Sequence, residues 1–122
     1  MSDLVTKLME ANLLGVFNER DPDKRAAAIA ATYSADVQWT DDEGVTTGHE
    51  QLEAKARHLQ EGLVGTYFAA SGPVHQTKGF GFLAWEVRRA DNDEAVMTGF
   101  DAALIADERI TALWTVLTGA PS

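Results

Sequence analysis

Asp41 stands where a carboxylate could do acid–base chemistry beside apolar side chains. It ends an extended stretch, and because side chains of such a stretch alternate between two faces, Val37, Trp39 and Asp41 project together. Asp41 is then either a turn residue that hydrogen-bonds its own loop amides or a group at the mouth of an apolar pocket, where desolvation favours its protonated form. Only the second arrangement makes it a candidate general base. Its neighbours Asp42 and Glu43 are expected to face solvent.

Two further side chains are candidates for proton transfer. Asp101 lies between Gly99 and Ala103 on one face of a predicted strand, which leaves space beside its carboxyl group. A buried acid among small neighbours is protonated near neutral pH and can donate a hydrogen bond; the alternative is a carboxylate paired with an arginine of a neighbouring strand. His75 lies in another predicted strand, and imidazole titrates near neutrality. The alternative for His75 is a partly exposed side chain without a catalytic role.

Three tryptophans, Trp39, Trp85 and Trp114, are candidates for the walls of a cavity that binds a flat apolar molecule. The alternative is that all three simply fill the core. We expect no metal and no cofactor. His49 and His58 are nine residues apart, unlike the four-residue spacing of helical zinc motifs, and the chain has no phosphate-binding glycine loop or dinucleotide fingerprint.

Composition limits the class of protein. The 122 residues fit one domain, 1–122, and 45% hydrophobic residues suffice for a packed core. The formal net charge of −9 argues against nucleic acid and anionic membranes as partners. The sequence contains no cysteine, which excludes disulfides, thiolate nucleophiles and iron–sulfur clusters. Without an apolar run of membrane-spanning length or a signal-peptide pattern at the N-terminus, we expect a cytoplasmic protein.

The elements that must position these side chains follow from hydrophobic periodicity. Helical spacing predicts helices over about 3–18, 22–33 and 48–62. Asp21 before Pro22 predicts the N-cap of the second helix, and Thr47 with Glu50 has the spacing of a capping box for the third. Alternating patterns predict strands over about 67–77, 80–89, 95–105 and 109–118, with an interruption at residues 72–73. Their short turns require antiparallel neighbours.

The predicted strands are apolar on both faces. In the last strand we expect one face to carry Ile110, Ala112, Trp114 and Val116, and the other to carry Leu113 and Leu117. Helices segregated to one face of an antiparallel sheet make an α+β domain. Three helices can cover one face, so the second face predicts a homodimer formed through the sheet.

The order helix, helix, strand, helix and four antiparallel strands resembles the nuclear-transport-factor-2-like superfamily, in its SnoaL-like and ketosteroid-isomerase-like branch. The resemblance covers nearly the whole chain. It is carried by residues 17–21 closing the first helix, residues 33–37 entering the first strand and Gly48 opening the third helix. Residues 82–85, 99–101 and 109–110 carry it through the later strands.

This resemblance implies a cone-shaped fold, in which a curved, mixed, mostly antiparallel sheet and three N-terminal helices enclose a pocket. It also implies roles for residues at matching positions. Asp41 matches the general base of ketosteroid isomerases, and Asp101 matches the acid of their oxyanion hole. Leu13 replaces the oxyanion-hole tyrosine, which argues against ketosteroid isomerisation itself. We expect Leu13, Phe17, Tyr33 and the three tryptophans to contact the ligand.

The functional expectation is a pocket that binds a small apolar organic molecule. If the protein is an enzyme, it is of isomerase or cyclase type: Asp41 moves a proton while Asp101 or His75 stabilises the oxygen that gains charge. Lyase or hydrolase chemistry stays open. The alternatives are a non-catalytic dimeric binding or interaction module and a cavity that sequesters its ligand unchanged, because this fold hosts such functions too.

Overall fold

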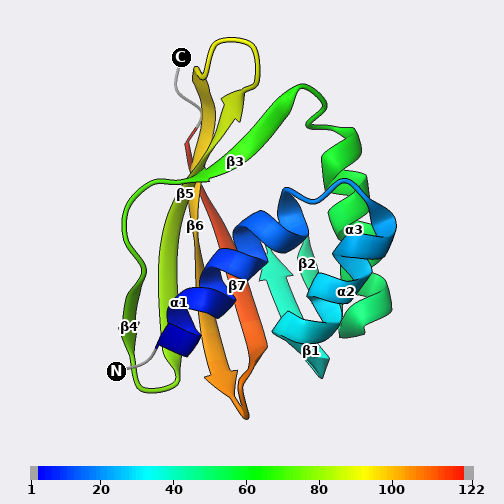
Figure 1. Ribbon diagram of the computed structural model, residues 1–122, viewed down its shortest axis with the longest axis vertical. Helices are drawn as coiled ribbons and strands as arrows, with labels where there is room; N and C mark the ends of the chain where they lie inside the picture. Colours follow the sequence, from blue (N-terminus) through cyan, green and yellow to red (C-terminus); the bar gives the residue numbers. More distant parts are fainter. Residues whose placement is uncertain (1–2, 120–122) are drawn as a thin grey trace.

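The computed structural model describes residues 3–119, in which helices pack on one face of a seven-stranded sheet (Figure 1). The helical segments are α1 (Asp3–Glu10), the π-helix η1 (Ala11–Phe17), α2 (Pro22–Thr32) and α3 (Gly48–Glu61). The strands are β1 (Tyr33–Asp41), β2 (Gly44–Thr47), β3 (Thr66–Ala70), β4 (His75–Thr77), β5 (Phe80–Arg89), β6 (Ala95–Ala106) and β7 (Arg109–Gly119).

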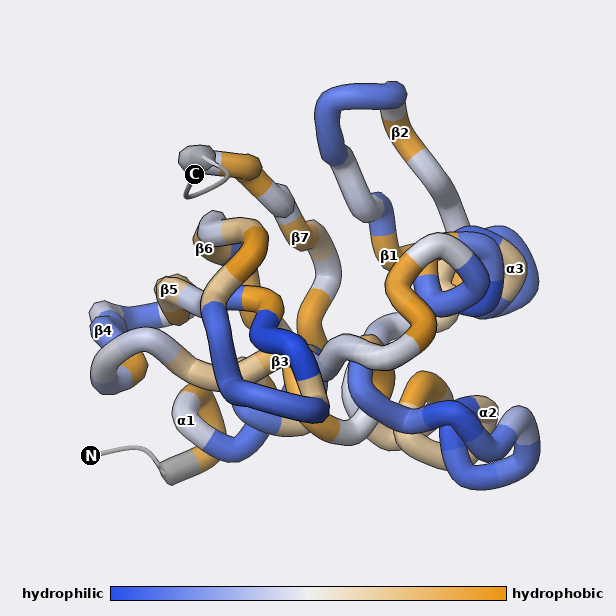
Figure 2. Tube along the Cα trace, turned by 90° about the horizontal axis from the view of Figure 1, so that it is seen from above, coloured by the Kyte–Doolittle hydropathy of each residue, from blue (hydrophilic) through white to orange (hydrophobic). Residues whose placement is uncertain are grey.

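The sheet is mixed, mostly antiparallel and not closed. Its strand order is β2-β1-β7-β6-β5-β3, with β4 paired to β5 beside β3. Strand β1 runs parallel to β7, and every other pairing is antiparallel. Seen from above, the strand ends follow an arc, with α1 and α2 on one side of it (Figure 2). This confirms the expected α+β fold with a curved sheet and three N-terminal helices.

The first helical segment has the predicted extent but not the predicted winding throughout. Its first eight residues form an α-helix, and residues 11–17 form a π-helix. Buried residues occur on both parts, including Met9, Leu13, Val16 and Phe17. Asn12 is a polar residue within this buried stripe and is fully buried. Because π-helical turns are often associated with functional sites, the environment of Asn12 is of particular interest.

Both α2 and α3 begin where they were predicted, but only α2 has the predicted cap. Asp21 caps α2, since its side chain accepts hydrogen bonds from the amides of Asp23 (2.9 Å) and Lys24 (3.4 Å). The capping box predicted for α3 is wrong, because Thr47 makes no side-chain cap bond. Instead the Thr47 amide donates to the Gln51 side chain at 3.1 Å, one residue beyond Glu50. Within residues 3–119 no helix is both long and apolar enough to cross a bilayer.

Strand β7 departs from strict alternation near its start. Ile110 and Leu113 are both fully buried, although they lie three residues apart. The register explains this, because Ile105 pairs with Ile110 whereas Leu104 pairs with Ala112, which leaves one extra residue in β7. The prediction that Ile110 shares the face of Ala112 was therefore wrong. Strand β2, which follows the turn after Asp41 and pairs with β1, was not predicted.

The sheet face turned away from the helices is apolar and uncovered in the single chain. Leu104, Trp114 and Val116 expose 44%, 39% and 41% of their surface. The rings of Phe82 and Phe100 lie 5.0 Å apart, and neither residue is fully buried. The opposite face carries Leu83, Trp85, Val87, Ala103 and Leu113, which are buried.

Candidate functional site

A cavity of about 340 Å³ lies between the inner sheet face, η1 and α3. This volume is at the lower end of the range for small-molecule sites. Apolar walls are formed by Leu13, Phe17, Trp39, Leu59, Leu63, Phe68, Trp85, Met97 and Leu117. Polar groups line two regions. We call Asp101 with Thr115 the inner end, and we call Asp41, Asp42, Glu43, Lys55 and His58 the rim.

Four aromatic rings form a continuous wall of this cavity. The centre of the Phe17 ring lies 5.0 Å from that of Trp39 and 6.2 Å from that of Phe68. The ring centres of Phe68 and Trp85 lie 5.3 Å apart in an edge-on arrangement. These rings come from η1, β1, β3 and β5, which are far apart in the sequence. A flat apolar ligand can therefore stack or make edge contacts over much of its surface.

Asp101, at the inner end, is 3% exposed and accepts three hydrogen bonds from uncharged groups. Its Oδ1 atom accepts from Trp85 Nε1 at 3.1 Å and from Thr115 Oγ1 at 2.9 Å, and its Oδ2 atom accepts from Asn12 Nδ2 at 2.7 Å. The sheet explains two of these contacts, because Asp101 pairs with Thr115 of β7 and with Leu83 of β5, two residues from Trp85. The expected alternative, an arginine partner, is not observed for this described residue.

Gly99 makes room for the Trp85 side chain rather than for a ligand. A Cβ atom at Gly99 would lie only 2.5 Å from the Trp85 ring and 2.5 Å from the Val116 carbonyl oxygen. Gly99 and Trp85 are paired across β5 and β6. The small residue beside Asp101 thus allows the Trp85 indole to reach over β6 and donate to the carboxylate.

The network continues from Asp101 into the helical layer. The Tyr33 hydroxyl donates a short hydrogen bond to Asn12 Oδ1, which orients the Asn12 amide so that its nitrogen faces Asp101. On the other side, Trp39 Nε1 donates to Thr115 Oγ1 at 2.9 Å. All buried polar side-chain atoms in residues 3–119 have partners, so this network is fully satisfied.

Burial raises the pKa of Asp101 to about 6, because desolvation penalises its ionised form. The hydrogen bonds from Thr115, Trp85 and Asn12 favour the ionised form and oppose this effect. Burial likewise raises the pKa of Tyr33 well above its ordinary value, and the nearby Asp101 carboxylate adds to that shift. A carboxyl group with a pKa near neutrality can both accept and release a proton at physiological pH.

Asp41 lines the same cavity from the rim, where Lys55 is its partner. Lys55 Nζ lies 2.6 Å from Asp41 Oδ2 and 3.5 Å from Glu43 Oε1, and it lies 5.2 Å from the centre of the Trp39 ring. Asp41 also accepts a hydrogen bond from the Glu43 amide at 2.9 Å. Asp41 is thus a turn carboxylate that also lines the cavity and is paired with a cation. Asp41 and Asp101 share no hydrogen-bonding partner among the described residues.

Three predicted site residues lie outside the cavity lining. Trp114 lies on the opposite sheet face, because alternation along β7 places Thr115 inside and Trp114 outside. His75 is exposed on β4, where its ring lies 5.9 Å from Phe82. Tyr33 is buried behind Asn12 and reaches the site only through that amide. Leu13, Phe17, Trp39 and Trp85 line the cavity as the ligand-contact prediction requires.

Asn12, Thr115 and Lys55 were missed by reasoning from the sequence. A signal existed for Asn12, because an amide within an apolar helical stripe requires a buried partner. Thr115 lies between Leu113 and Leu117 on the inward face of β7, so alternation alone would have indicated it. Within residues 3–119 no three histidine, aspartate or glutamate side chains are grouped so that they could hold a metal ion.

No family model matches the sequence, and a search of the curated proteins finds no match. Solved structures do match. A SnoaL-like family protein from Agrobacterium tumefaciens, a candidate isomerase, aligns over 97% of this chain and 100% of its own, with a TM-score of 0.88 at 18% identity. The chain has the fold of NTF2-like proteins. A candidate SnoaL-like polyketide cyclase from Jannaschia sp. aligns over 96% of this chain and 89% of its own, with a TM-score of 0.76 at 14% identity.

A third structure with the NTF2-like fold is a candidate ketosteroid isomerase from Kribbella flavida. It aligns over 99% of this chain and 82% of its own, with a TM-score of 0.69 at 14% identity. These structures agree with the resemblance recognised in the sequence. At such low identity they establish the NTF2-like fold alone, and function must be argued from the residues of the cavity.

Proposed function

We propose that the cavity binds a small, largely apolar organic molecule and that Asp101 moves a proton on it, as in an isomerisation or a cyclisation. The observation that carries this proposal is Asp101 itself, an acid in the cavity wall with a pKa of about 6. A general base works best when its pKa lies near the working pH. The apolar walls support the choice of ligand, because they offer aromatic contact and exclude water.

The roles of the two acids are exchanged relative to the sequence-based expectation. Asp41 is engaged by the Lys55 ammonium group, which favours a positioning role for Asp41 over that of a base. Lys55 is the cation that lines the cavity, and in this proposal it stabilises the oxygen of the ligand that gains negative charge. Asp101 removes the proton, and Thr115, Trp85 and Asn12 hold its ionised carboxylate in place.

The proposal is tested by hydrogen exchange on a bicyclic ketone. The protein is incubated with 2-tetralone in D₂O, and deuterium incorporation at the carbon atoms beside the carbonyl group is followed by NMR. Asp101→Asn is expected to slow the protein-dependent exchange by about 10²-fold or more, which is the usual contribution of a general base. Asp41→Asn is expected to have a smaller effect, since it only releases Lys55.

Full exchange in the Asp101→Asn protein, or loss of exchange only in Asp41→Asn, would overturn the assignment of the base. Binding of 2-tetralone with no exchange in the wild-type protein would favour the alternative function, a cavity that holds its ligand unchanged. The fully satisfied network around Asp101 is the observation that keeps this alternative open.

We also propose that a second copy of the chain covers the outer sheet face, giving a homodimer. The apolar surface of Leu104, Trp114 and Val116 supports this, because monomeric proteins rarely leave such a patch uncovered. Sedimentation should show a dimer for the wild-type chain and a monomer for Trp114→Glu. The control is Val64→Glu, because Val64 is 78% exposed and follows α3, away from this face. A monomeric wild-type chain would refute the proposal.

A further inference from the structure

The hydrogen bonds at the inner end of the cavity restrict which ligand groups can bind there. The side chains with a single donor that line that end, Trp39, Trp85 and Thr115, each use this donor within the network. Trp85 and Thr115 donate to Asp101 Oδ1, at 3.1 and 2.9 Å, and Trp39 donates to Thr115 at 2.9 Å. Of the side chains that line the cavity at this end, Thr115, Trp85 and Trp39 therefore leave no N–H or O–H group for a ligand.

One acceptor position does remain at the inner end. A carboxylate oxygen can accept about two hydrogen bonds. Asp101 Oδ1 already accepts two, whereas Oδ2 accepts one, from Asn12 at 2.7 Å. Asp101 lines the cavity, so a ligand that hydrogen-bonds to this carboxylate finds its acceptor position on Oδ2. A carboxylate oxygen with a remaining acceptor position favours a ligand group that donates a hydrogen bond.

The rim adds a second, independent restriction, which is its charge. Three carboxylates, of Asp41, Asp42 and Glu43, line it together with one ammonium group, that of Lys55. Lys55 is already paired with Asp41 at 2.6 Å and lies 3.5 Å from Glu43. The rim thus keeps an excess of negative charge, which disfavours an anionic ligand on entry. The ionised Asp101 would repel an anion at the inner end as well.

We infer that the cavity selects uncharged ring compounds that carry a hydrogen-bond donor at their buried end, such as a phenolic or enolic hydroxyl group, and that it rejects carboxylates. This inference rests on the proposed function for the location of the site, and it goes further by naming the ligand class. The donor of the ligand meets Asp101 Oδ2, and its ring system lies against Phe17, Trp39 and Trp85.

The three tryptophans allow a direct binding test by two-dimensional ¹H–¹⁵N NMR of the indole groups. Trp39 and Trp85 line the cavity, and Trp114 lies on the opposite face and serves as an internal control. The probes are 2-naphthol, 2-methoxynaphthalene and 2-naphthoate near neutral pH. All three share the naphthalene ring system. 2-Naphthol carries a hydrogen-bond donor, 2-methoxynaphthalene carries only an acceptor, and 2-naphthoate carries a negative charge.

We expect 2-naphthol to shift the signals of Trp39 and Trp85 and to bind about tenfold or more tightly than 2-methoxynaphthalene, because it forms a hydrogen bond to a charged group. We expect 2-naphthoate to bind about tenfold or more weakly than 2-naphthol. Asp101→Asn should abolish the preference for 2-naphthol, since an amide nitrogen in the place of Oδ2 cannot accept.

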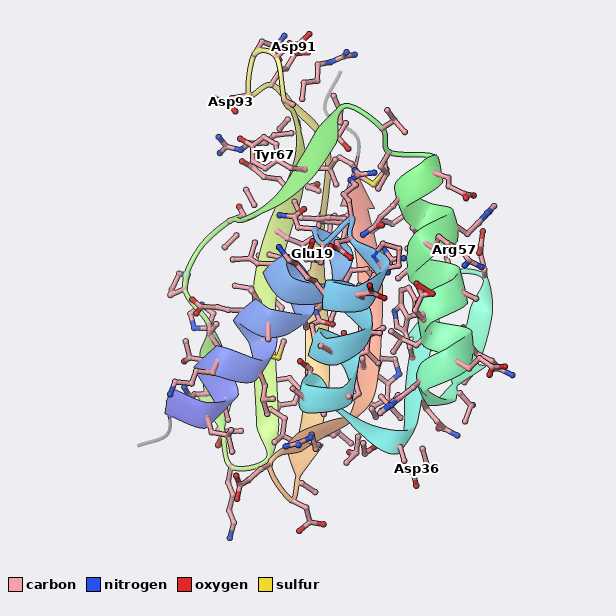
Figure 3. The ribbon with its side chains drawn as sticks, turned by 45° about the vertical axis from the view of Figure 1, so that its right-hand side comes forward. Glu19, Asp36, Arg57, Tyr67, Asp91 and Asp93 are labelled. Carbon is pink, nitrogen blue, oxygen red and sulfur yellow. The ribbon has the colours of Figure 1, made fainter. Side chains whose placement is uncertain are left out.

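The charge of the rim is tested separately with a matched pair of variants. Asp42→Asn is expected to improve binding of 2-naphthoate several-fold, because it removes one rim carboxylate. Asp91→Asn removes the same charge from the exposed turn between β5 and β6, at the top of Figure 3; Asp91 does not line the cavity, so this variant should leave binding unchanged.

The outcomes separate this inference from the function on which it rests. Equal affinities for 2-naphthol and 2-methoxynaphthalene, or tighter binding of 2-naphthoate, would overturn the inference and leave the proposed apolar ligand site intact. Signals of Trp39 and Trp85 that respond to none of the three probes would overturn both.

Discussion

The variant Asp101→Asn is expected to be more stable than the wild-type protein above pH 6, by about 3 kcal/mol. Burial raises the pKa of Asp101 from 3.8 to about 6, so the ionised carboxylate is less favourable in the folded chain than in the unfolded chain. Each unit of pKa difference corresponds to about 1.4 kcal/mol. An asparagine has no ionised form and avoids this cost.

The pH dependence follows from the same shift. Well below pH 3.8, the ordinary pKa, the carboxyl group is protonated in both states and costs nothing. As the pH rises from about 4 to 6, the unfolded chain loses this proton before the folded chain does, so the wild-type protein loses stability relative to the variant. Above about pH 6 the full difference is present. Urea unfolding of both proteins between pH 4 and 8 measures this change.

The network can accommodate the asparagine because its members can reorient. If the Asn12 amide flips, its oxygen accepts from the new amide nitrogen, and its own nitrogen donates to the Tyr33 hydroxyl oxygen. Asp91→Asn, at an exposed position, is the control and should change stability by no more than about 0.5 kcal/mol. A loss of stability in Asp101→Asn above pH 6, or a difference between the proteins that does not vary with pH, would contradict this account of the site.

A second large effect is expected for Arg25→Met, which should lower the free energy of unfolding by about 3–5 kcal/mol. Arg25 on α2 is 1% exposed. Its guanidinium group donates to Glu53 of α3 at 2.5 and 2.9 Å, to Gln60 Oε1 at 2.7 Å and to the Glu19 carbonyl oxygen at 2.9 Å. Removing it leaves these acceptors, one of them charged, without their donor.

Loss of Arg25 should also disturb the cavity wall, because Arg25 links the segment before α2 to α3 through hydrogen bonds. Gln60, held by Arg25, donates to the carbonyl oxygens of Phe17 and Glu19 at 3.0 and 2.8 Å, and Phe17 is part of the cavity wall.

Lys24→Met, on an exposed position of the same helix, is the matched control and should change stability by less than about 0.5 kcal/mol. Urea unfolding measures both variants. A loss below about 1 kcal/mol in Arg25→Met would show that the buried cation is not needed.

Local signals in the sequence predicted most of the fold. The Asp21-Pro22 pair predicted the start of α2, and alternation along β1 placed Val37 and Trp39 on the buried face. The two apolar sheet faces were also recognised. The bulge that buries Ile110 was not predictable in this way, because it depends on the register between β6 and β7 and changes no residue type.

The site was less predictable because its contacts join residues far apart in the chain. Asn12 and Asp101 are separated by 89 positions, and Trp39 and Thr115 by 76. Asp41 is 14 residues from Lys55, but its ion pair depends on how α3 packs against the end of β1. Residue types indicated an acid beside aromatic rings. Only the assembled sheet and helices show that Asp101 is the buried acid and Asp41 the paired one.

Asp101 is an ionisable carboxyl group in the wall of an apolar cavity, and burial raises its pKa to about 6. Its side-chain carboxyl carbon can be followed by ¹³C NMR through a pH titration, assigned by comparison with Asp101→Asn. We predict a midpoint near pH 6, accompanied by shifts of the Trp85 indole signal and not of the Trp114 signal. A midpoint at or below about 4, the value of an ordinary aspartate, would contradict the account.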